Sequence, residues 1–133
     1  MTEESFMKMM VETLARVPED QRNTMLSDKM RSLLSLSEKQ RTDAMKSMLI
    51  AALSLKDEEY LKIADTRTRV LMGFAEPDRN VLMKAYLSCM SSLDTSSKQK
   101  ETSCMKKILK SLPEQQRETM MKIIPPELSK EIQ

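Results

Sequence analysis

The softest potential metal ligands of this chain lie in two copies of one tripeptide. Ser-Cys-Met occurs at residues 88–90 and again at 103–105, and these copies contain both cysteines, Cys89 and Cys104. Thiolates and thioethers favour Cu(I), so the tripeptide raises the hypothesis of Cu(I) handling. A helical hairpin that turned near Leu93 would separate the two cysteines by roughly 10 Å along the helix axis. We therefore interpret Cys89 as a core residue, place Cys104 at the edge of the apolar stripe, and expect no metal site.

Few residues of this chain could carry other catalytic chemistry. The chain contains no histidine, the side chain that most often exchanges protons near neutral pH. Its single glycine, Gly73, excludes a glycine-rich phosphate loop. The carboxylates follow a helix-start pattern and form no separate acid and base pair. We expect a protein that is not an enzyme and uses no cofactor.

A basic segment offers a second kind of chemistry. Residues 98–110 contain five lysines and one glutamate, a local charge of +4 in a chain whose net charge is +2. On a helix, four of these lysines fan over one side: Lys100, Lys106, Lys107 and Lys110. Such a face attracts phosphates, although it lacks the arginines and aromatic residues of base recognition. A nucleic-acid-associated or regulatory protein is therefore the alternative function, and a solvated lysine face is the simpler interpretation.

Methionine is frequent, with 14 in 133 residues, and it gathers at both ends of the chain. Large exposed apolar surface marks interaction sites, and the flexible thioether adapts to varied partners. The predicted partner-binding residues are Met7, Met10, Met120, Met121 and Ile124. They indicate a protein partner or a homodimer, unless the two terminal helices pack on each other and close a bundle.

These candidate residues are set in a repeat of 19 residues without insertions. Its first position is apolar in every copy: Val17, Leu36, Leu55, Phe74, Leu93 and Leu112. The third position is acidic in five of six copies, and the sixth position is arginine in four: Arg22, Arg41, Arg79 and Arg117. A Glu and an Arg three residues apart lie on adjacent helical turns. We expect them to form exposed pairs, each contributing roughly 0.2–0.5 kcal/mol to stability.

The second half of each copy carries the burial pattern of an amphipathic helix. Apolar residues dominate the tenth position (Leu26, Met45, Ala64, Met83 and Met121) and the seventeenth (Leu33, Ala52, Leu71, Met90 and Leu109). Prolines and capping residues such as Ser37 and Asp94 start the helices. The pattern predicts an all-α fold in which about six to seven short antiparallel helices form one domain over residues 1–133. The helices either stack as a solenoid or close as a bundle.

The sequence also argues against a membrane-spanning or a secreted protein. No apolar run approaches the ~20 residues of a membrane span, and the N-terminal segment lacks the order of a secretion signal. We expect a cytoplasmic protein. The leading hypothesis is a non-enzymatic helical-repeat module for protein–protein interaction or scaffolding, which associates with itself or another protein through methionine-rich surface.

Overall fold

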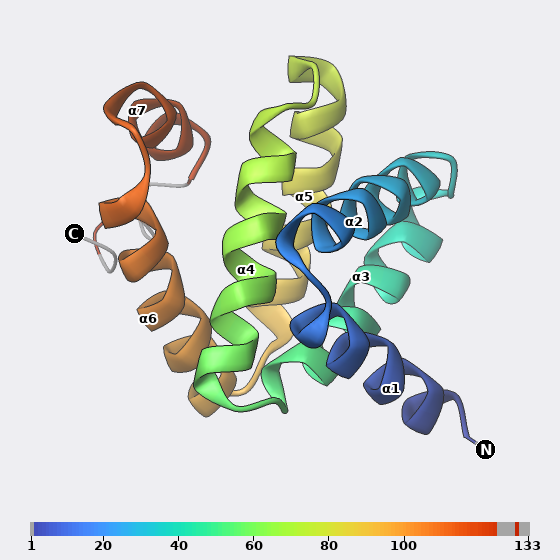
Figure 1. Cartoon of the computed structure of the whole chain (residues 1–133). Coiled ribbons are helices and arrows are strands. Elements are labelled where there is room, and N and C mark those ends of the chain that lie inside the picture. Colours follow the sequence, from blue (N-terminus) through green and yellow to red (C-terminus); the bar gives the residue numbers. More distant parts are fainter. Residues whose placement is uncertain (1, 125–129, 131–133) are drawn as a thin grey trace.

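The computed structural model describes residues 2–124 and residue 130. These residues form seven α-helices and no strand, which confirms the all-α prediction. The helices are α1 (Glu3–Arg16), α2 (Glu19–Leu34), α3 (Glu38–Leu53), α4 (Asp57–Met72), α5 (Glu76–Ser92), α6 (Thr95–Ser111) and α7 (Glu114–Ile123) (Figure 1). From α2 onward, each helix begins 19 residues after the previous one.

The helix starts use the chemistry that the sequence predicted. The Ser37 side chain accepts a hydrogen bond from the Gln40 amide, and the Gln40 side chain accepts one from the Ser37 amide, which completes a capping box. Asp94 caps α6 by accepting from the Ser97 amide. This bond is the main reason that the pKa of Asp94 is lowered. Acidic residues in the first turns of α1 to α5 complement the helix dipole.

Helices α1 to α4 each pack mainly against the second helix after them in the chain. The main contacts join α1 to α3, α2 to α4, α3 to α5 and α4 to α6, and α1 also packs on α4. Direct neighbours share less surface, so the chain winds as a compact array rather than as separate hairpins (Figure 1). Helices α1 and α7 lie on opposite sides of the molecule, so the terminal helices do not pack on each other.

The core follows the repeat. The seventeenth position is buried in every described copy, and its equivalent in α1 is buried too: Leu14, Leu33, Ala52, Leu71, Met90 and Leu109. The fold therefore confirms this position as core. None of the described helices is long and apolar enough to cross a membrane.

The arginines of the repeat do not form the exposed pairs that the sequence suggested. Arg22 retains only 7% of its exposure, and no ion pair joins it to Glu19 among the described residues. Its guanidinium reaches back to the end of α1 and donates to the carbonyls of Leu14 (2.7 Å), Ala15 (3.3 Å) and Val17 (2.8 Å). The prediction of a weak surface pair was wrong, because spacing along one helix does not reveal acceptors on the preceding helix.

Two further copies repeat this arrangement. Arg41 donates to the carbonyls at the end of α2, those of Leu33, Leu34 and Leu36. Arg117 donates to the carbonyls at the end of α6, those of Leu109, Lys110 and Leu112. The last turn of a helix has carbonyls without intrahelical partners and carries partial negative charge, so a guanidinium fork satisfies both needs. The repeated arginine thus fixes the starts of α2, α3 and α7 to the preceding helix ends.

The other three described copies depart from this rule: the sixth position holds Tyr60 in α4, Arg79 in α5 and Lys98 in α6. Tyr60 replaces the arginine in α4, and Lys100 of α6 serves the end of α3 instead, donating to the carbonyls of Leu53 (2.9 Å) and Leu55 (2.6 Å). In α5, the Nε atom of Arg79 is buried and has no hydrogen-bond partner in the described part of the chain. The sixth position therefore caps the preceding helix where it holds a suitable donor. In α4 it holds Tyr60, which does not cap α3.

Replacing Arg22 with methionine should destabilise the chain by about 1.5–3 kcal/mol, because buried carbonyls lose charged hydrogen-bond donors. The matched control is Arg31→Met. Arg31 is exposed, pairs with Asp28 at 3.4 Å and lies over the Phe74 ring at 6.0 Å, so its loss should cost less than about 1 kcal/mol. Urea unfolding followed by circular dichroism measures both values. Equal shifts in the two midpoints would contradict the capping role.

Candidate functional site

A buried cluster of four polar side chains joins three helices. Tyr60 and Arg67 come from α4, Tyr86 from α5 and Glu101 from α6. Glu101 has no exposed surface, and Tyr60 has none either. An ionised carboxylate is stable in a fully buried position only when it is paired and hydrogen-bonded.

Every carboxylate oxygen in this cluster has a donor. Tyr60 donates its hydroxyl to Oε2 of Glu101. Arg67 donates to Oε1 at 2.8 Å, and Tyr86 donates its hydroxyl to the same oxygen at 3.0 Å. Arg67 also donates to the Tyr60 hydroxyl at 3.2 Å and lies over the Tyr86 ring, 5.3 Å from its centroid. The four groups therefore form one closed network.

The environment holds both tyrosines in the neutral form. Burial raises the pKa of Tyr60 above its ordinary value, and the negative charge of Glu101 adds to the effect. The pKa of Tyr86 is raised for the same two reasons. Burial alone would lower the pKa of Arg67, but Glu101 and the two tyrosines together outweigh it, so the pKa of this guanidinium lies well above its usual value.

This network is suited to holding helices together rather than to proton transfer. A catalytic acid or base needs an atom that a substrate can reach, and Glu101 is enclosed with both oxygens already accepting hydrogen bonds. What the cluster does is cross-link α4, α5 and α6 through a single buried charge pair.

An apolar cavity of about 100 Å³ lies beside the cluster, in the interior of the array. Arg67 and Tyr86 form part of its wall. The thirteenth position of the repeat lines it in all six copies: Lys29, Met48, Arg67, Tyr86, Met105 and Ile124. The repeat therefore points one residue of each helix from α2 to α6, and Ile124 at the end of α7, at a shared interior space.

The structure separates the methionine-rich residues that the sequence grouped as one partner-binding surface. Met120 and Ile124 retain only 2% and 5% of their exposure, and Met121 is half-buried against the core. The prediction of an exposed surface at the C-terminal end was wrong for Met120 and Ile124, because the interior of the array receives them. Met7 and Met10 remain half-exposed on α1, on the opposite side of the molecule (Figure 1).

The predicted lysine face has fewer exposed lysines in the structure than the sequence suggested. Lys100 points inward, where it caps α3, pairs with Asp57 at 3.3 Å and lies over the Tyr60 ring at 5.8 Å. Its placement among phosphate-binding residues was wrong, because it has protein acceptors of its own. Lys106, Lys107 and Lys110 are exposed.

Both cysteines are free and buried, which agrees with the interpretation of Cys89 as core. The Cys89 thiol donates to the Thr42 carbonyl at 3.5 Å. Burial raises the pKa of each thiol, so the reactive thiolate is disfavoured at both positions. Among the described residues, no group of three or more His, Cys, Asp or Glu side chains could hold a metal ion.

Sequence reasoning missed the buried cluster, although the repeat contains its signal. The ninth position reads Met25, Ala44, Ile63, Leu82, Glu101 and Met120, so Glu101 is the single charge in an apolar column. Tyr60 is the single aromatic residue in a column of arginine and lysine. These two departures from the repeat mark the polar site in the sequence.

Comparisons of the chain with protein-family models, curated proteins and solved structures gave no match.

Replacing Glu101 with leucine should destabilise the fold by about 2–4 kcal/mol, because Arg67, whose side chain is 20% exposed, is left as a largely buried charge without its partner. Adding Arg67→Met in the same chain should recover part of this loss, since both charges are then absent. The control is Glu58→Leu on the exposed surface of α4, expected within about 0.5 kcal/mol of wild type. Urea denaturation measures all three. A double mutant less stable than the sum of its single mutants would contradict the pairing.

The two tyrosines should make stability fall at high pH. In the unfolded chain they ionise near pH 10, whereas the folded pKa values are raised, so the folded state binds more protons above pH 10. The stabilisation is complete below pH 10 and should then decline by about 1.4 kcal/mol per pH unit for each tyrosine.

Because the chain has only two tyrosines, tyrosinate absorbance reports this cluster alone. The folded chain should show little of it at pH 11, and urea-unfolded chain should show nearly all. Full absorbance from folded chain would contradict the buried network.

Proposed function

We propose that this chain is a non-enzymatic binding module that self-associates through the first two turns of α1. The supporting observation is that α1 buries only Val11, Leu14 and Ala15, all in its C-terminal half. Phe6 and Met9 keep 62% and 53% of their exposure, the two highest values among the large apolar side chains of the described residues. Their end of the helix extends away from the array (Figure 1).

The exposed face has the composition of a self-complementary contact. Phe6, Met9, Met10 and Thr13 follow one another at helical spacing, and this stripe contains no charge. A two-fold interface places the same patch on both partners, so an uncharged patch meets its copy without opposing like charges. The methionines can adapt to the partner surface. These features support a second copy of the chain as the partner.

The alternative, binding to nucleic acid through the lysines of α6, has less support. Three of its four proposed residues remain exposed: Lys106, Lys107 and Lys110. Phosphate-driven association weakens steeply with salt, whereas apolar association persists or strengthens. Salt dependence therefore separates the two functions.

Sedimentation velocity over a concentration series should reveal a reversible dimer of the wild-type chain that persists at high salt. Replacing Phe6 and Met9 together with glutamate should shift the chain to monomer, because charges then oppose each other across the two-fold contact. Far-UV circular dichroism should remain near wild type, since neither residue is buried.

The matched control is Val81→Glu, at an exposed apolar residue of α5 that retains 37% of its exposure. This variant should dimerise like wild type. A wild-type chain that stays monomeric at high concentration would overturn self-association, and loss of dimer in the control would show that the effect is not specific to α1.

A further inference from the structure

We propose that the interior cavity binds the hydrocarbon chain of a free monocarboxylic acid, with the carboxylate held by the ammonium group of Lys29. The proposal is independent of self-association through α1. It rests on three properties of the cavity: its volume, the side chains that line it, and the position of one cation in its wall.

The volume suits one short alkyl chain. The cavity measures about 100 Å³ and has mostly apolar walls. An apolar cavity of about 150 Å³ in another protein stays dry and binds a molecule the size of benzene. The cavity of this protein is smaller, so at its resting volume it admits a short segment of one alkyl chain and excludes a two-chain lipid.

The walls can adapt to a longer chain. Six methionines line the cavity: Met30, Met45, Met48, Met83, Met105 and Met120. Methionine has a flexible and polarizable side chain that repacks at little cost. An alkyl chain that exceeds the resting volume can therefore enter by rotation of these side chains.

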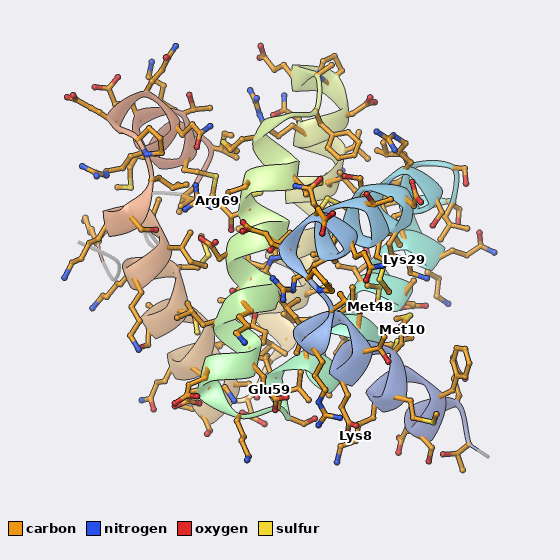
Figure 2. All side chains as sticks on the ribbon, in the orientation of Figure 1. Lys8, Met10, Lys29, Met48, Glu59 and Arg69 are labelled. Carbon is orange, nitrogen blue, oxygen red and sulfur yellow. The ribbon has the colours of Figure 1, made fainter. Side chains whose placement is uncertain are left out.

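The two cations of the wall differ in what they already bind. Arg67 gives its charge to Glu101, at 2.8 Å. Lys29 of α2 makes no ion pair with any described residue, and it is half-exposed together with Met45 and Met48 of α3. Lys29 and Met48 lie on the side of the molecule where α1, α2 and α3 converge (Figure 2). This edge of the cavity therefore joins an apolar interior to an unpaired positive charge.

A carboxylate with an alkyl chain complements both features. Its head pairs with the Lys29 ammonium at the half-exposed edge, and its chain replaces empty apolar space. Each methylene that enters the cavity should tighten binding about fourfold. A neutral alcohol of equal length should enter the same space without the ionic contribution.

Octanoate and octanol are the test ligands, added to full-length chain labelled with ¹³C at the methionine methyl groups. We expect octanoate to shift the methyl resonances of the six lining methionines. Met9 and Met25 lie outside the lining and are exposed, so their signals should not move. Octanoate that shifts only exposed methyl groups, or none, would overturn the cavity site.

Titration calorimetry then tests the head group. Lys29→Gln should weaken octanoate binding about tenfold and leave octanol binding unchanged, because only the ionic contact is lost. The control Lys62→Gln, at an exposed lysine of α4, should leave both ligands unaffected. Equal octanoate affinity in wild type and Lys29→Gln would overturn the proposed role of Lys29.

A cavity-filling variant provides a second measurement. Ala52 is buried in the cavity wall, and Ala52→Leu should weaken both ligands by at least tenfold while circular dichroism stays helical. The Phe6 and Met9 double variant should bind octanoate like wild type, which keeps failure of the ligand site distinguishable from failure of self-association. Full octanol binding by helical Ala52→Leu would place the ligand elsewhere and overturn the proposal.

Discussion

Arginine donors that satisfy the carbonyls at the preceding helix end fix three of the junctions between helices in this chain. Arg22, Arg41 and Arg117 each donate to three carbonyls at the end of the preceding helix, which belong to the residues eight, seven and five positions earlier in every case. Because each guanidinium also belongs to the first turn of the next helix, it fixes the junction between the two. The 19-residue repeat sets these junctions at a constant register, and helices α1 to α4 each meet their second neighbour.

The exceptions to the repeat create the interior polar site. Tyr60 occupies an arginine position in α4, and its hydroxyl is used in the core rather than at a helix end. Adjacent residues of α6 compensate for this change. Lys100 caps α3 in place of the absent arginine, and Glu101 accepts the Tyr60 hydroxyl. One substitution in the repeat is thus linked to two consecutive charged residues about 40 positions later.

The two ends of the array differ because only one of them is covered. The C-terminal methionine and isoleucine side chains, Met120 and Ile124, complete the interior, where they also line the cavity. The N-terminal half of α1 extends past the helices on which α1 packs, and Phe6 stays exposed. Similar composition at both ends therefore has opposite consequences for surface and core.

The helices, their starts and the seventeenth-position core were determined by the sequence, because caps, amphipathic spacing and a constant period are local properties of the chain. The partners of Arg22, the inward turn of Lys100 and the burial of Met120 were decided by tertiary structure, since their contacts lie on other helices. Glu101 depends on both the sequence and the tertiary structure. Its charge in an apolar column was visible in the sequence, but its three donors come from α4 and α5 and are brought together only by the winding of the array.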